Sequence, residues 1–233
     1  MNRDRSSENG LSRRSQSRRG TDHRIPPALY LGVILAFALW IVMFVIRPLN
    51  FWLMMSLSTS LLATIAFIFG RPLIFREELT WKNMLLGILA AGALYVVFWT
   101  GNEFLILMSR FLPTLIPDRA GNINAVYANR GILSPLLVGI LLFFPIGFGE
   151  EIFWRGFVQR RCSVKWSPLS AWIVTTILYV VVHLPTGNPV LILAAFTCGA
   201  FWGGLYAVTG RLVPVLVSHM VWDPVIFVIW PIH

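Results

Sequence analysis

Charged residues are scarce in this sequence. Only 12% of the 233 residues are Asp, Glu, Lys or Arg, whereas a soluble domain carries about 25%. Hydrophobic residues make up 57% of the chain, and its mean hydropathy is +0.72. This composition excludes an ordinary soluble domain and predicts a membrane protein.

Several kinds of motif are also absent. The two cysteines, Cys162 and Cys198, do not have the Cys-x-x-Cys spacing of a metal or redox site. The chain has no Gly-rich phosphate loop, no repeat of solenoid length and no nucleic-acid motif. Its pI of about 10.6 comes mainly from the N-terminal tail and a few loops, so we expect no nucleic-acid partner.

Long apolar runs dominate the rest of the chain. A transmembrane helix needs about 20 apolar residues, and seven runs come near that length, the third continuing past Glu103 to Met108. The runs are Ala28–Ile46, Phe51–Phe69, Met84–Trp99, Ile132–Phe148, Leu169–Leu184, Val190–Val208 and Leu212–Trp230. We therefore predict an all-α fold, a polytopic membrane bundle of about seven transmembrane helices. Residues 1–25, rich in Arg and Ser, are predicted to form a disordered, basic, cytosolic tail.

Basic residues gather in the loops on one side of this predicted bundle. They are Arg71, Arg76, Lys82, Arg160, Arg161, Lys165 and Arg211. Since cytoplasmic loops carry an excess of Lys and Arg, the N-terminus is predicted to be cytosolic. Residues 110–131, which hold three Arg, are expected to form an outer loop. The chain is expected to be an integral protein of the plasma membrane.

Six ionisable residues interrupt the later apolar runs. A charge at the bilayer centre costs roughly 2.5–3.5 kcal/mol on insertion scales, so such residues usually mark function. They are Glu150, Glu151, Arg155, His183, His219 and Asp223. The rise of about 1.5 Å per helical residue allows them to share one pocket, which we expect on the cytosolic half of the bundle. We also expect the helix to loosen at Gly147 and Gly149, just before the two glutamates.

Spacing suggests separate roles within this pocket. Glu151 and Arg155 are four residues apart, so they are expected to form an ion pair that supports the site. Glu150 is rotated away from this pair and is a candidate general base. His219 is likewise four residues from Asp223, and the two are expected to share one helix face and to meet a bound peptide carbonyl.

These residues fall into three ordered motifs. The motifs are Glu150-Glu151-x-x-x-Arg155, then Tyr179-x-x-x-His183, then His219-x-x-x-Asp223. Together they resemble the motifs of the CPBP family of intramembrane proteases, also called Abi, which includes the CAAX proteases. The resemblance covers about residues 133–230. It predicts a protease core at 132–233, preceded at 26–131 by transmembrane helices and a loop.

The resemblance implies a glutamate-dependent intramembrane endopeptidase. On that basis Glu150 and His183 activate a water, while His219 and Asp223 stabilise the oxyanion. Two positions are notable: the second motif usually begins with Phe but here has Tyr179, and the third ends in Asn or Asp and here has Asp223, which can be charged where Asn cannot. The expected partners are the lipid bilayer and a peptide or membrane-protein substrate. The identity and prenylation of that substrate and the oligomeric state stay open.

Three alternatives accompany this prediction. No cofactor is expected, although zinc held by Glu150, His183 and His219 is the alternative, because sites of two His and one carboxylate are common. A proton-coupled transporter also places ionisable residues inside a bundle. A non-catalytic immunity protein that binds a peptide is the third alternative.

Overall fold

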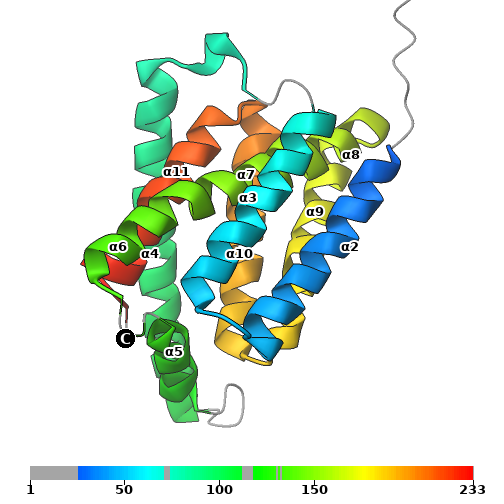
Figure 1. The fold of residues 1–233 in the computed structure, drawn as a ribbon. Helices are drawn as coiled ribbons and strands as arrows, with labels where there is room; N and C mark the ends of the chain where they lie inside the picture. Colours follow the sequence, from blue (N-terminus) through cyan, green and yellow to red (C-terminus); the bar gives the residue numbers. More distant parts are fainter. Residues whose placement is uncertain (1–25, 71–73, 112–117, 130, 132, 233) are drawn as a thin grey trace, which may run out of the picture.

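The computed structural model describes residues 26–70, 74–111, 118–129, 131 and 133–232, and within them every regular element is helical (Figure 1). Among the described residues, six helices are long and apolar enough to cross a membrane, and a seventh apolar helix is shorter. The six spans are Pro27–Ile46, Phe51–Gly70, Trp81–Phe111, Pro135–Lys165, Pro168–Thr186 and Pro189–Thr209, and the shorter helix is Val213–Ile229. The predicted all-α bundle of about seven helices is confirmed. The predicted tail, residues 1–25, lies outside the described residues.

Three of the helices continue into a short extension, and three others are uninterrupted. Helix α2 (Pro27–Ile41) continues as η1 (Val42–Ile46), α9 (Pro168–His183) as η5 (Leu184–Thr186), and α11 (Val213–Pro224) as η6 (Val225–Ile229). Helices α3 (Phe51–Gly70), α4 (Trp81–Phe111) and α10 (Pro189–Thr209) are uninterrupted. The fourth span is a chain of α6 (Pro135–Leu141), η3 (Leu142–Gly147), α7 (Phe148–Phe153), η4 (Trp154–Gln159) and α8 (Arg160–Lys165).

Local sequence explains where several helices begin. Ser134, Ser167 and Asn188 each stand before a proline, and their side chains accept a hydrogen bond from the third residue after them. Proline at the first helical position loses no hydrogen bond and has a suitable φ angle, so this pairing is a strong start signal. At the other end of α10, Gly210 has a φ of 63°, a conformation that stops the helix and favours glycine.

One helix was not predicted. Within the expected outer loop, α5 (Arg119–Ala128) forms a short helix that begins at Asp118, whose side chain accepts from the Gly121 amide. It packs an apolar side onto the bundle through the buried Ile123 and the Tyr127 ring, which lies against Phe227. An apolar pattern of only ten residues is too short to be detected as a membrane span.

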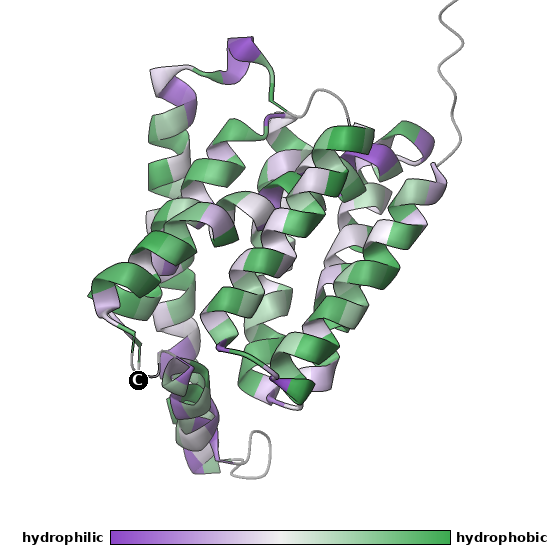
Figure 2. Ribbon diagram, viewed as in Figure 1, coloured by the Kyte–Doolittle hydropathy of each residue, from purple (hydrophilic) through white to green (hydrophobic). Residues whose placement is uncertain are grey.

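The outer surface of the bundle is strongly apolar. Hydrophobic residues run along the helices while hydrophilic ones gather at the connections and on α5 (Figure 2). Leu31 and Ile34 on α2 and Leu89 on α4 are more than 60% exposed. Such exposed apolar surfaces are expected where a protein contacts lipid rather than water. The chain is therefore an integral membrane protein by its described structure.

The two ends of the bundle are formed by different connections (Figure 1). The start of α2 and the connections α3–α4, α8–α9 and α10–α11 form one end, here called the basic end. The connection α2–α3, helix α5, the connection α9–α10 and the end of η6 form the other, here called the opposite end. Six of the predicted inner basic residues lie at the basic end: Arg76, Lys82, Arg160, Arg161, Lys165 and Arg211. Arg71 lies outside the described residues.

Among the described residues, the larger of two hydrophobic core clusters joins the helices. Its fully buried tryptophans come from three different spans: Trp40 of α2, Trp154 of η4 and Trp202 of α10. The core includes side chains from both predicted parts of the chain, 26–131 and 132–233. The boundary between those two parts stays a prediction.

Candidate active site

The fourth span carries the two glutamates into the middle of the bundle. Its helix is interrupted at Phe144, whose φ of −154° and ψ of 125° are not helical, and Pro145 follows inside the same segment. The expected loosening at the glycines is therefore wrong, because the break lies before them. A Cβ on Gly149 would stand 2.8 Å from the Thr59 carbonyl oxygen of α3. The glycine thus permits close packing of α7 on α3.

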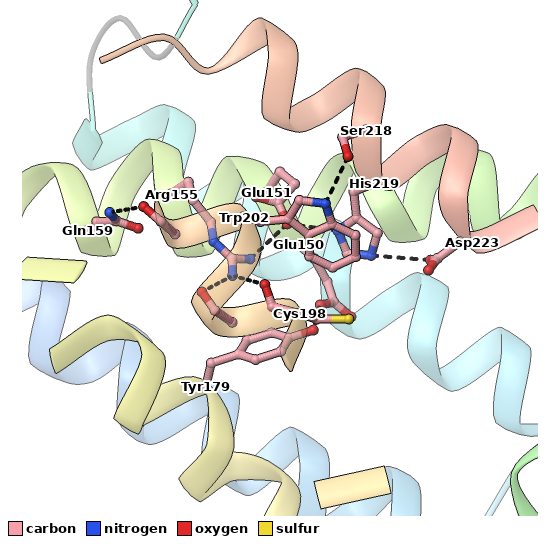
Figure 3. A network of polar contacts seen from close by, with 12 residues as sticks. Glu150, Glu151, Arg155, Gln159, Tyr179, Cys198, Trp202, Ser218, His219 and Asp223 are labelled. Carbon is pink, nitrogen blue, oxygen red and sulfur yellow. Dashed lines mark hydrogen bonds and ion pairs between the residues drawn. The ribbon is translucent and has the colours of Figure 1, made fainter. Parts of the chain in front are cut away.

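Glu151 is the centre of a buried charge network (Figure 3). Its Oε1 lies 2.7 Å from Arg155 Nη1 and 2.7 Å from His219 Nδ1, and all three side chains are almost fully buried. The expected ion pair between Glu151 and Arg155 is present. The contact with His219 was not anticipated, since spacing along one helix says nothing about a partner 68 residues away.

Arg155 also ties the fourth span to α10. Its Nη2 donates to the backbone carbonyls of Cys198 and Gly199, at 3.4 and 3.3 Å. The guanidinium lies over the ring of Tyr179 at 5.1 Å and over that of Trp202 at 5.8 Å. These partners offset the cost of burying the cation. Sequence reasoning missed Trp202 and the two carbonyls, which have no motif signal.

His219 is held between two carboxylates. Besides Glu151 on Nδ1, its Nε2 lies 3.3 Å from Asp223 Oδ2. An imidazole can donate from both nitrogens only as the imidazolium cation, so this arrangement suits a charged ring. Trp202 stacks on the ring at 3.7 Å between centroids and donates its indole N–H to Ser218 (Figure 3). These contacts therefore hold the His219 ring in one orientation and favour its cationic form.

Helix α11, which carries His219, is itself anchored at the basic end. Glu78 of the short η2 (Arg76–Glu78) accepts hydrogen bonds through Oε2 from the backbone amides of Leu212 and Val213, at 2.7 and 3.2 Å. These amides begin α11 and have no partner within the helix. The carboxylate also complements the positive end of the helix dipole. A loop from the N-terminal part thus sets the position of α11.

Glu150 has a different environment from its neighbour. It is 3% exposed, and its Oε2 accepts a hydrogen bond of 2.7 Å from the Tyr179 hydroxyl. No cation pairs with it among the described residues, whereas Glu151 has two and Asp223 has one. Glu150 therefore differs from Glu151 and Asp223, because its hydrogen-bond partner, the Tyr179 hydroxyl, is neutral.

His183 joins the site from α9 with both nitrogens occupied. Its Nδ1 lies 2.7 Å from the Tyr179 carbonyl, and its Nε2 lies 3.1 Å from Trp40 Nε1. Because the Trp40 indole can only donate, Nε2 must accept and Nδ1 carries the hydrogen. A water can reach Nε2 only in place of Trp40. The tryptophan belongs to α2, outside every motif, and sequence reasoning did not find it.

These polar groups line one small cavity. It has a volume of about 110 Å³ and is lined by Glu150, Tyr179, His183, His219 and Asp223 together with apolar side chains. A water takes about 30 Å³ of liquid, so the cavity is suited to a few waters. A larger apolar cavity of about 410 Å³ adjoins it between α4, α5, α10 and α11. The two share the lining residues Val126, Leu191, Ala194, Trp222 and Phe227.

The cavity faces the opposite end of the bundle. Its outer lining includes Phe44 at the end of η1, Phe51 and Trp52 at the start of α3, and Asn129 just after α5. All of these segments lie at the opposite end in Figure 1. The expectation that the pocket and the basic loops share one half of the bundle is therefore wrong. The rise along each helix predicted how far each site residue lies from the end of its own helix. The actual depths of these residues in the bundle also depend on helix tilt and on the break in the fourth span.

A metal site is not assembled in this arrangement. Within the described ranges, no group of three or more His, Cys, Asp and Glu side chains is placed to hold a metal ion. The alternative zinc ligands Glu150, His183 and His219 line one cavity, but the nitrogens of both histidines are already engaged. The side chains as placed do not fit a zinc ion. The expectation of no cofactor stays a prediction.

Comparison with known proteins agrees with the motifs. No curated protein and no solved structure matches the chain. Residues 132–225, which hold all three motifs and all six predicted site residues, match the family model of the type II CAAX prenyl endopeptidase Rce1-like proteins. The match covers 94 of the 233 residues, so it is a similarity of the C-terminal part of the chain to that family.

Proposed function

We propose that this protein is an intramembrane endopeptidase that hydrolyses a peptide bond with a water activated by Glu150. The observation that carries the proposal is the contrast between two adjacent acids. Glu151 is neutralised by Arg155 and His219, whereas Glu150 faces a water-sized cavity with a neutral partner. A general base needs a carboxylate that can gain and lose a proton, and Glu150 meets that need. The family match supports a protease.

The steps follow from the groups around the cavity. Glu150 takes a proton from a water as the water oxygen bonds to the peptide carbonyl carbon. His219, a cation in the cavity wall, stabilises the negative oxygen through its charge, because its two N–H groups already face Glu151 and Asp223. Glu150 then gives its proton to the leaving nitrogen as the C–N bond breaks. The products are a carboxylate and an amine.

The remaining residues of the motifs position these two groups. Ionised Asp223 can only accept hydrogen bonds, so its role is to orient His219 rather than to donate to the oxyanion. Glu151 and Arg155 support the other side of His219. His183 contributes to water activation only when water replaces the Trp40 indole at Nε2. Otherwise it completes the cavity wall.

The substrate class follows from the two adjoining cavities. The polar cavity holds the reacting groups, and the neighbouring cavity is lined almost entirely by apolar side chains. A membrane-associated peptide or a membrane protein fits this pair, with apolar side chains beside the cleaved bond. The substrate approaches from the opposite end of the bundle, which is the outer side of the membrane if the basic end is cytosolic.

The first prediction tests catalysis. Glu150→Gln keeps the volume of the side chain and removes the base, so proteolysis should be lost while the protein still folds and inserts. Glu103→Gln is the matched control, because Glu103 lies exposed on α4 outside the polar cavity. Membranes from cells carrying each variant should be compared by proteomics for a peptide that stays uncut with Glu150→Gln alone.

The recovered peptide should then be cleaved by the purified protein in liposomes. Full cleavage by Glu150→Gln would exclude Glu150 as the base. Proton flux without cleavage would favour the transporter. Tight binding of the peptide without cleavage by the wild type would favour the non-catalytic alternative.

A further inference from the structure

Tyr179 connects two of the predicted site residues at once. Its hydroxyl donates to Glu150 Oε2 at 2.7 Å, and its backbone carbonyl lies 2.7 Å from His183 Nδ1. The side chain is 5% exposed and lines the polar cavity.

The ring of Tyr179 is held on several sides. Trp154 packs against it edge to face, with centroids 5.3 Å apart and planes at 89°. His183 lies at 4.8 Å on one side, and the Arg155 guanidinium lies over the ring at 5.1 Å. A ring fixed in this way directs its hydroxyl to one point. That point is the Glu150 carboxylate.

The hydrogen bond from Tyr179 gives the two carboxylate oxygens of Glu150 different roles. Tyr179 occupies Oε2, and no other described side chain donates to this carboxylate. The other oxygen, Oε1, then stays available to a water in the cavity. Because the hydrogen bond from Tyr179 already restricts the Glu150 side chain, that side chain loses less conformational freedom when a water binds. This smaller entropic cost favours catalysis.

We propose that the Tyr179 hydroxyl is a positioning residue that orients Glu150 and stabilises its ionised form for water activation. This inference rests on the proposed function. It predicts that the hydroxyl affects the reaction step more than substrate binding. The hydroxyl does not touch the reacting atoms and acts through Glu150 alone.

The test variant is Tyr179→Phe, which keeps the ring and its packing and removes one oxygen. Hydrogen bonds to charged groups are among the stronger ones, so kcat should fall by about tenfold to a hundredfold. KM should change by less than about twofold, because the ring that lines the cavity is retained. The acid limb of the pH–activity profile should also move to higher pH, because the ionised form of Glu150 loses a hydrogen-bond donor.

Tyr95→Phe is the matched control. Its hydroxyl, on α4, donates to the Trp230 carbonyl at 3.2 Å, and it lines neither cavity. It should leave kcat and the pH profile unchanged. A ring-fluorinated tyrosine at position 179 keeps the hydroxyl and makes it a stronger donor, and it should move the acid side of the profile to lower pH.

Infrared difference spectra keep the inference testable without turnover. The carboxyl bands assigned by Glu150→Gln should shift in Tyr179→Phe and not in Tyr95→Phe. Unchanged kcat, pH profile and carboxyl bands in Tyr179→Phe would overturn the inference. If the wild type cleaves nothing, the proposed function fails, while a shifted carboxyl band would still establish the hydrogen bond to Glu150.

Discussion

At the scale of single residues, the site depends on how buried charges are shared. Glu151 Oε1 meets both Arg155 and His219, and its Oε2 has no hydrogen-bond partner among the described residues. Burying a charge is expensive unless its partners are close and well placed. The network is therefore sensitive to the loss of any one member.

A prediction at this scale concerns the ion pair. Glu151→Gln and Arg155→Met should each lower the free energy of unfolding by about 3–5 kcal/mol, because each leaves a buried charge without its partner. Thermal unfolding in detergent measures this. Glu151→Gln should also reduce catalysis in the protein that remains folded, since His219 loses one of its two carboxylates.

The double variant Glu151→Leu with Arg155→Met provides the control. It removes both charges, so it should recover part of the stability lost in either single variant. It should not recover activity, because His219 still lacks Glu151. A double variant less stable than both single ones would show that the pair does not stabilise the fold.

At the scale of elements, the position of the glutamates depends on one close helix contact. Helix α7 approaches α3 at Gly149, where a Cβ would meet the Thr59 carbonyl oxygen at 2.8 Å and the Thr59 Cβ at 3.0 Å. Glu150 is the next residue along α7. A change in the distance between these helices would therefore move the proposed base within its cavity.

The corresponding prediction uses two alanine variants. Gly149→Ala should lower the free energy of unfolding by about 1–3 kcal/mol, since the helices must separate to admit the methyl group. It should also reduce kcat. Gly92→Ala is the matched control, because a Cβ on this residue of α4 would meet nothing within 4 Å. An alanine in an open helical position should be neutral or stabilising.

Thermal unfolding and turnover of the two variants should be compared in the same detergent. Equal stability and equal kcat for Gly149→Ala and Gly92→Ala would show that the contact between α7 and α3 does not position Glu150.

At the scale of the whole molecule, the fold separates the basic loops from the cavity. The segments that form the outer lining of the polar cavity lie at the opposite end (Figure 1), whereas the six predicted inner basic residues lie at the basic end. Cytoplasmic loops are enriched in Lys and Arg, so we infer that the cavity faces the outside of the cell. Substrate would then be cleaved in the outer half of the bilayer.

Cysteine labelling tests this orientation. In a background lacking Cys162 and Cys198, Leu79→Cys probes the basic end and Leu49→Cys the opposite end. The two leucines are a matched pair, with 57% and 58% of their surface exposed. An impermeant thiol reagent should label Leu49→Cys in intact cells and Leu79→Cys only after lysis. The reverse pattern would place the cavity on the cytosolic side.

The class of protein and a set of candidate residues for the site could be predicted from the sequence alone. Hydrophobicity is a local property, and a run of about 20 apolar residues must become a helix in lipid, so each predicted run overlaps an observed helix. The fourth run, Ile132–Phe148, nevertheless stops well short of the observed end at Lys165, because the ionisable residues of the site follow it. Charges inside such runs are costly, which singled out Glu150, Glu151, Arg155, His219 and their partners. The ion pair four residues apart also follows from helix geometry.

Only the tertiary structure decided which side chains meet between helices. The contacts of Glu151 with His219, of Tyr179 with Glu150 and of Trp40 with His183 join residues 29 to 143 positions apart. Spacing along one helix carries no information about the rotation, tilt and depth of another, which are set by packing. For the same reason the structure, and not the sequence, decided that the cavity faces away from the basic loops.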